Sequence, residues 1–323
     1  MGPKRDRSML SRRHIRIKIF QALYAYFKGS VSDIARGEKS LIESTERIHE
    51  LYLLQLSVLI ELKHFAEKLI EERKRKRLPT EEDLQPNEKF VNNQLLVQLE
   101  NNQYIAKKIN EYRISWADHQ EFIKKVFQKI TETESFKTYM ESGTQSYEED
   151  KAIIIRLFKN QIADHEILQH IFEEQNIHWS DDHYFVCGYV VNTLKDFKES
   201  YNENYVLPDL YKDKKDDLDF LKTLYRQVLV NNEEYQSIVM GKAQNWEADR
   251  IAIVDFILMK MAICELEKMS SIPIKVTLNE YIEISKLYST PKSRVFINGV
   301  LDKLVIEFKE NGKINKRGRG LLN

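Results

Sequence analysis

The sequence is poor in glycine and proline, with ten and six of them in 323 residues. Sandwiches and barrels need many turns, so this scarcity argues against them. It also leaves few loops that could cradle a phosphate, and neither GxGxxG nor GxxxxGK(S/T) occurs. No apolar run approaches the ~18 residues of a membrane span, and the basic N-terminus lacks an apolar signal core. We therefore expect a cytoplasmic protein.

Motifs of catalysis and metal binding are also missing. The two cysteines, Cys187 and Cys264, lie in separate apolar runs, as small core residues do in a reducing compartment. The eight histidines are scattered, with no HExxH, and neither CxxC nor GxSxG is present. These absences predict that the protein is not an enzyme and holds no metal or cofactor.

Charge is unevenly distributed, although acids and bases are equal in number at 50 each. Residues 1–18 carry seven bases and one acid, and residues 309–319 are basic as well. Residues 141–240 instead hold 20 acids and ten bases. A basic end on a neutral protein favours a polyanionic partner, with a solvated tail as the alternative.

Hydrophobic periodicity predicts helices along almost the whole chain. Ser11 is placed to cap a first helix that runs to Phe27 and stops at Gly29. A longer helix follows, with an apolar stripe from Leu41 to Leu69 and a basic last turn. Further helices are expected at 87–113, 118–142, 147–175, 180–200, 216–240, 246–269, 275–288 and 292–310.

The three tryptophans indicate an internal repeat. Trp116, Trp179 and Trp246 are spaced 63 and 67 residues apart, and an acid follows each of them closely. Each unit reads as an amphipathic helix, a turn and a second helix that opens near Trp, although chance resemblance between helices is the alternative. Such units bury their apolar faces by stacking, so we expect an ordered helical array over residues 80–215.

Arginines are concentrated at the start of the first helix. Arg12, Arg13 and Arg16 share one side of it, and three positive charges in a first turn oppose the helix dipole. Folding alone should not favour them there, whereas a bound phosphate would. Arginine also stacks on unpaired bases, so this cluster indicates nucleic acid.

The C-terminal third carries an ordered set of motifs. They are WxxDR at 246–250, DxILxKxAxxEL at 255–266, IPxxVxLNEYIEISK at 272–286 and FINGVLD at 296–302. Together with the arginine-rich helix, this set resembles the NusB family of bacterial transcription antitermination factors. The match covers about 216–309 and 11–27, whereas 80–215 has no counterpart in short family members. Lys260 stands where the family often has Arg, and Leu278 where it often has Ile.

The resemblance implies an all-α, NusB-like bundle with two helical subdomains and no catalysis. It implies binding of a single-stranded boxA element, notably in ribosomal RNA leaders, together with NusE, a ribosomal small-subunit protein, to modify elongating RNA polymerase. The expected parts are N-terminal helices at 1–79, a helical-repeat insertion at 80–215, a C-terminal subdomain at 216–310 and a basic tail at 311–323.

The resemblance also implies the site residues. The RNA-binding set is Arg12, Arg13, Arg16, Lys292, Ser293, Arg294 and Phe296. The partner-binding set is Tyr24, Asp249 and Asp255.

Two other functions stay open at this stage. One is a helical scaffold for protein partners that has lost RNA affinity and docks through the insertion. The other is RNA modification, because this fold also occurs fused to ribosomal RNA methyltransferases, but the sequence has neither a glycine-rich cofactor loop nor a catalytic cysteine motif. Phe296 itself could stack on a base or belong to the core.

Overall fold

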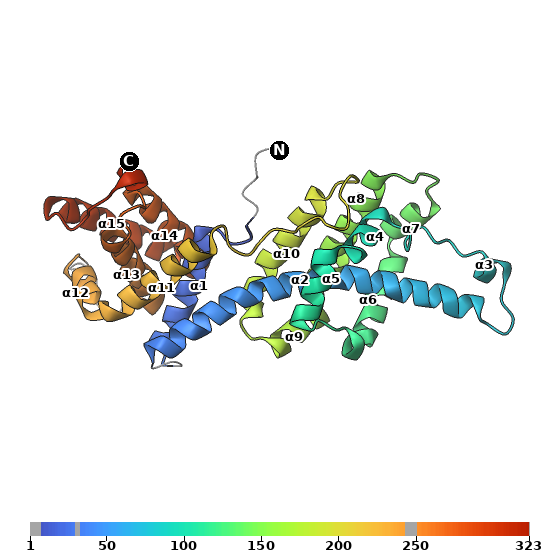
Figure 1. The fold of residues 1–323 in the computed structure, drawn as a ribbon. Coiled ribbons are helices and arrows are strands. Elements are labelled where there is room, and N and C mark those ends of the chain that lie inside the picture. Colours follow the sequence, from blue (N-terminus) through green and yellow to red (C-terminus); the bar gives the residue numbers. More distant parts are fainter. Residues whose placement is uncertain (1–7, 30–32, 243–250, 323) are drawn as a thin grey trace. The chain divides into compact units, whose positions relative to one another are not determined.

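The computed structural model describes residues 8–29, 33–242 and 251–322. These residues form helices and connecting loops without a strand, which confirms the all-α class (Figure 1). The α-helices are α1 (Arg12–Phe27), α2 (Ile34–Lys74), α3 (Glu81–Leu84), α4 (Gln94–Glu100), α5 (Gln103–Tyr112), α6 (Gln120–Glu132), α7 (Glu134–Glu141), α8 (Tyr147–Leu157), α9 (Glu166–Gln175), α10 (Trp179–Asp196), α11 (Lys214–Val230), α12 (Asn232–Lys242), α13 (Ile253–Lys268), α14 (Ile274–Tyr288) and α15 (Pro291–Glu310). Short 3₁₀ or π segments occur at Ala117–His119, Phe158–Ile162 and Gly318–Leu321.

Helix α1 has the bounds that its local sequence predicts. The Ser11 hydroxyl accepts a hydrogen bond from the His14 backbone N–H, and the His14 side chain accepts one from the Ser11 backbone. Just past the C-terminal end, Gly29 has φ +81°, a left-handed conformation that glycine adopts without strain. The predicted cap and stop are both confirmed.

The chain divides into two compact units. The first consists of residues 1–45 and 209–323, and the second of residues 46–208. The long helix α2 contributes to both units, because the division falls within it. The boundaries expected from the sequence, after 79 and after 215, therefore differ from the divisions between the units.

The first unit is built around α13. Every residue from Ile257 to Leu266 is buried, as expected for a helix that is apolar on nearly all sides. Helices α1, α11, α12, α14 and α15 pack on it (Figure 1). This arrangement brings the N-terminal helix against helices that follow it by some 200 residues.

In the second unit the middle of α2 is the buried element. Residues 51–60 are all buried, and both described tryptophans hydrogen-bond to this helix. Trp116 Nε1 donates to Ser57 Oγ at 2.8 Å, and Trp179 Nε1 donates to the Arg47 carbonyl at 3.2 Å. Trp179 is the first residue of α10, as the repeat predicted, and Trp246 lies outside the described residues.

Among the described helices none is long and apolar enough to cross a membrane. Lys316 and Arg317, in the tail predicted from charge alone, are hydrogen-bonded to the end of α13 and the turn after it.

Candidate nucleic-acid interface

The arginines at the start of α1 each contact a different helix. Arg12 forms ion pairs with Asp216 and Asp217 on α11, the latter at 3.2 Å, and its guanidinium lies 4.4 Å from the centre of the Phe220 ring. Its side chain is still one third exposed. Arg12 therefore joins α1 to α11 and keeps part of its guanidinium at the surface.

Arg13 joins α1 to α14. Its Nε and Nη2 donate to the two carboxylate oxygens of Glu280 at 2.7 and 2.8 Å. The hydrogen bond with Glu280 raises the pKa of Arg13 against the effect of burial. The Arg13 side chain remains 39 % exposed.

Arg16 joins α1 to α13 inside the core. Its Nε and Nη2 donate to the carboxylate of Glu265 at 2.7 and 2.8 Å, and both side chains are at most 2 % exposed. Burial lowers the pKa of Arg16, but the attraction and hydrogen bonds of Glu265 outweigh it, and the net shift is upward. Arg16 is therefore the cation of a buried ion pair.

These contacts correct the sequence argument about the first turn. The expectation that folding would not favour three arginines there is wrong, because acids from α11, α13 and α14 compensate them. The partners are more than 200 residues away, so local sequence could not reveal them. Arg12 and Arg13 can still meet a ligand at the surface, but Arg16 has no exposed side chain with which to do so.

The second group of predicted residues lies at the start of α15. The Thr290 hydroxyl caps the helix by accepting from the Ser293 N–H, and Pro291 occupies the first turn. Lys292 is exposed, whereas Ser293 and Arg294 are half-buried. The Arg294 Nε is buried without a hydrogen-bond partner among the described residues.

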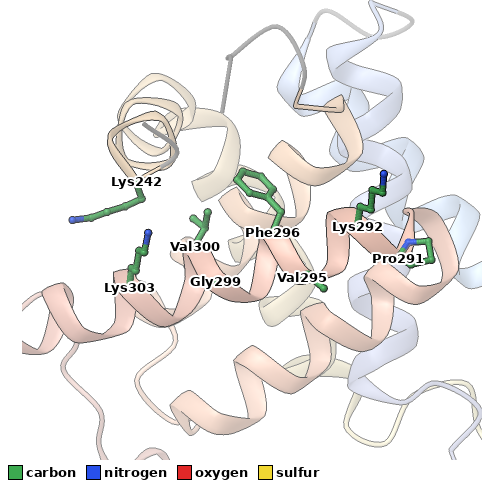
Figure 2. Close-up of a pocket in the computed structure, with 8 residues that line it drawn as sticks. All are labelled: Lys242, Pro291, Lys292, Val295, Phe296, Gly299, Val300 and Lys303. Carbon is green, nitrogen blue, oxygen red and sulfur yellow. The ribbon is translucent and has the colours of Figure 1, made fainter. Parts of the chain in front are cut away.

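A groove runs along α15 from these residues towards α12 (Figure 2). Its volume is about 570 Å³. It is lined by Lys242, Pro291, Lys292, Val295, Phe296, Gly299, Val300 and Lys303. The lining is thus mainly apolar, with an aromatic side chain and three lysines.

Two of the three lysines have no acidic partner in the described part of the chain. Lys242 is paired with Glu307, but Lys292 and Lys303 form no ion pair there. Sequence reasoning missed Lys242 and Lys303. Lys303 could have been found from the sequence, because it follows Phe296 by seven residues and so lies on the same side of α15. Lys242 could not, because it belongs to another helix. Phe296 is 7 % exposed, so it is both a core residue and part of the lining.

Helix α14 connects the two predicted groups. In its middle Glu280 binds Arg13, and at its end the Tyr288 hydroxyl accepts a hydrogen bond from Gln21 Nε2 at 3.2 Å. Eight residues of helix separate these contacts, or ~12 Å. The start of α1 and the start of α15 are therefore two separate places on one unit.

The residues predicted to bind a protein partner have different environments. Tyr24 is 38 % exposed on α1. Asp255 is only 3 % exposed, and it accepts a hydrogen bond from the Ser289 hydroxyl at the end of α14. Asp255 thus holds α13 to α14 from inside, and the expectation that it is a surface contact is wrong. Asp249 lies outside the described residues.

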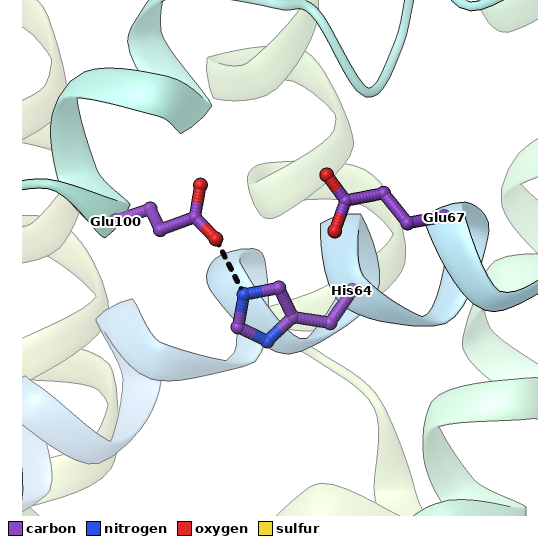
Figure 3. A group of neighbouring side chains, drawn as sticks. All are labelled: His64, Glu67 and Glu100. Atoms are coloured by element: carbon purple, nitrogen blue, oxygen red, sulfur yellow. Dashed lines mark hydrogen bonds and ion pairs between the residues drawn. The ribbon is translucent and has the colours of Figure 1, made fainter.

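Among the described residues, one cluster of possible metal ligands occurs in the second unit, and no sequence motif indicated it. His64, Glu67 and Glu100 hold ligand atoms within 4.8 Å of one another, and His64 Nε2 lies 2.6 Å from Glu100 Oε1 (Figure 3). However, Lys63 is buried beside them and is paired with both glutamates. The ammonium group already supplies the positive charge that a metal would bring, so the cluster is explained as an ion-pair network.

Comparison with known proteins supports the resemblance seen in the sequence. The model of the NusB family matches residues 189–305. Transcription antitermination protein NusB of Salinibacter ruber is 45 % identical over 104 residues, which are 32 % of this chain and 65 % of that protein. The protein of the same name from Chloroherpeton thalassium is 42 % identical over 105 residues, or 32 % of this chain and 50 % of that one.

A third relative is covered more completely. Transcription antitermination protein NusB of Clostridium botulinum is 36 % identical over 117 residues, or 36 % of this chain and 81 % of that protein. The chain thus spans between half and two thirds of the first two relatives and four fifths of the third. No solved structure matches it significantly.

Proposed function

This chain belongs to the NusB family, and from that premise we propose that it is a transcription antitermination factor that acts by binding RNA. Its ligand would be boxA-like single-stranded RNA, notably in ribosomal RNA operons. It would act as an adaptor in the cytoplasm, bringing this RNA and NusE to elongating RNA polymerase, and would carry out no catalysis.

The observation that carries the proposal is the groove on α15, whose lining residues all lie within the range matched by the family model. Lys292 and Lys303 have no acid to neutralise them among the described residues, so they are available to phosphates. The apolar lining around Phe296 offers a surface to unpaired bases, which single-strand binders use through stacking and apolar contact. Ser293 and Arg294 flank this surface in the first turn of α15.

Arg12 and Arg13 supply the second contact of the proposed RNA site. Each keeps a third or more of its side chain exposed while it is paired with an acid. A phosphate can share such a guanidinium, because five N–H donors are available and a carboxylate uses two. Arg16, which the sequence placed with them, acts in this proposal by holding α1 on α13.

NusE would contact the chain through a surface that includes Tyr24. Of the two residues of the predicted partner set that the structure describes, Tyr24 is the exposed one, and Lys28 lies 5.9 Å from the centre of its ring. Asp249 stays part of the proposal from the sequence resemblance alone. Asp255 is omitted because it is buried.

The test is a titration of the full chain with a fluorescent boxA-like single-stranded RNA at two salt concentrations, with and without NusE. We expect binding that weakens with salt, with a slope set by the number of phosphates contacted, and tighter binding when NusE is present. A scrambled RNA of the same length is the control. An RNA affinity too weak to measure in both conditions would contradict the proposal.

The second candidate is a helical scaffold that binds proteins without RNA. It is favoured by one observation, that all three arginines of α1 have acidic partners within the chain. The same titration separates the two functions, because such a scaffold would bind no RNA with or without NusE.

A further inference from the structure

The C-terminal tail is attached to the end of α13 by specific contacts. Lys316 Nζ donates to the carbonyls of Glu265 and Met269 at 3.2 and 3.0 Å, and the Arg317 N–H donates to the Ser270 carbonyl at 2.9 Å. The last carbonyls of a helix lack partners within it, and a lysine there also complements the helix dipole. The tail therefore caps α13.

Close packing at Gly320 holds the tail in the same place. Gly320 is buried, and a Cβ added to it would lie 2.1 Å from the Ser270 carbonyl oxygen. Real Cβ atoms essentially never lie within 3.0 Å of a non-bonded atom, so only glycine lets the two backbones approach this closely. The position of residues 316–320 is thus set by the end of α13.

The attached tail adds charge to a basic corner of the first unit. Arg317 and Arg319 are exposed on the tail, and Lys268 and Lys275 are exposed just before and just after the Ser270 turn. In the described part of the chain none of these four residues has an acidic partner. We call these four residues the corner patch.

The acids closest in sequence to Lys268 and Lys275 are already neutralised. Glu265 is paired with Arg16, Glu267 with Lys313 at 3.6 Å, and Glu280 with Arg13. The corner patch therefore keeps its positive charge. Helix α14 links the corner patch to the start of α1. Lys275 lies on α14 five residues before Glu280, which binds Arg13, and five residues span ~7.5 Å of helix.

We propose that the corner patch binds the phosphate backbone of the RNA and extends the contact that begins at Arg12 and Arg13. This inference rests on the proposed function. We assign a run of phosphates rather than an acidic peptide, because the patch continues the surface that begins at Arg12 and Arg13, which the proposed function gives to RNA, and its two arginines can bind phosphate with two parallel hydrogen bonds each. In this proposal the attached tail forms part of the protein surface that binds RNA.

The test compares two double variants. The tail double variant combines Arg317→Ala and Arg319→Ala, and the control combines Lys124→Ala and Lys137→Ala. The control pair removes the same charge from exposed lysines of the second unit. The probe is a boxA-like single-stranded RNA lengthened by several nucleotides at both ends, and binding is followed by fluorescence anisotropy. Because a single-stranded phosphate contact contributes about 0.7 to the salt slope, the tail variant should lose about 1.4 of slope and bind roughly tenfold more weakly at low salt.

A second variant tests whether RNA binding depends on the attachment of the tail as well as on its charge. Gly320→Val keeps all four basic residues but cannot pack against Ser270. We expect it to weaken RNA binding as well, with a helical circular dichroism spectrum unchanged from the wild type. Wild-type RNA affinity in Gly320→Val would show that attachment of the tail is not needed and would overturn the inference.

The remaining outcomes are also decisive. If the wild type binds RNA and the tail double variant binds it equally well with the same salt slope, the inference fails while the proposed function stands. If the wild type binds no RNA, both fail. If polyglutamate binds the wild type and the tail double variant weakens that binding as much as it weakens RNA binding, the corner patch binds acidic chains in general and the assignment to RNA is overturned.

Discussion

Arg16 and Glu265 form a two-point ion pair in the core, although 249 residues separate them in the sequence. The carboxylate also accepts hydrogen bonds from the Thr277 hydroxyl at 2.8 Å and the Tyr281 hydroxyl at 3.1 Å. Four donors from two helices, α1 and α14, thus converge on one buried acid of α13. The network satisfies the carboxylate fully, which a buried charge requires.

Replacement of Arg16 should destabilise the first unit strongly. Arg16→Ala leaves the Glu265 carboxylate buried without its cation, a change that typically costs about 3–5 kcal/mol. We expect a loss of this size in urea unfolding. Lys286→Ala, which breaks a surface pair with Glu283, is the matched control and should cost no more than about 1 kcal/mol. Equal effects of the two substitutions would contradict the role given to Arg16.

A separate prediction about RNA affinity follows from the two lysines of the groove on α15 that lack an acidic partner among the described residues. Lys292→Ala combined with Lys303→Ala should weaken binding of boxA-like RNA and lower the salt slope by about 1.4, because two phosphate contacts are removed. Both residues are at the groove surface, so thermal stability should change little. Anisotropy titrations at several salt concentrations measure the slope. An unchanged slope would place the RNA elsewhere.

Lys260 makes stability depend on pH. Its side chain is 4 % exposed, and its Nζ donates only to uncharged oxygens, of Asn232 at 2.7 Å and Gln236 at 3.0 Å. Burial lowers the pKa of Lys260 to about 8, against about 10.4 in an unfolded chain. Between these values the unfolded chain keeps a proton that the native protein loses, so this group makes stability rise with pH.

A comparison with Lys260→Met isolates that effect. The free energy of unfolding of the wild type, relative to that of the variant, should rise by about 1–3 kcal/mol between pH 7.5 and about pH 10. Urea unfolding of both proteins at several pH values measures it, and other titrating groups cancel in the difference. A difference that falls or stays constant would show that the pKa of Lys260 is not lowered in the native protein.

The two cysteines should be unreactive in the native protein. Burial raises the pKa of Cys187 and of Cys264 to about 12, so almost no thiolate forms near neutral pH, and both side chains are inside the protein. We expect a thiol reagent such as Ellman's reagent to label neither cysteine within minutes, and to label both at once in denaturant. Rapid native labelling of either one would contradict its burial.

Residues 80–215 should be protected from amide exchange. Their helices are hydrogen-bonded and their apolar positions, Leu95, Phe122, Ile154 and Val190 among them, are buried. Exchange measured by mass spectrometry should be slow in α4, α6, α8 and α10. Rapid exchange throughout these helices, with α13 protected, would show that this part is not a stable array.

Local sequence determined the helices of this protein and the ends of several of them. Ser11 caps α1, Gly29 ends it and Thr290 caps α15 through contacts that lie within four residues, so residue type and spacing are enough to predict them. The ordered motifs between 255 and 302 likewise indicated the NusB family without any knowledge of the packing.

Tertiary structure alone decided which charged residues face solvent. Arg13 and Arg16 are the same residue type in the same turn, yet one is 39 % exposed and the other 2 %, because only Arg16 faces α13. Asp255 and Lys260 are buried for the same reason. The groove and the corner patch each combine side chains from separate helices or from a helix and the tail. Such placement depends on how distant segments pack, and local periodicity carries no information about the partner that a helix face will meet.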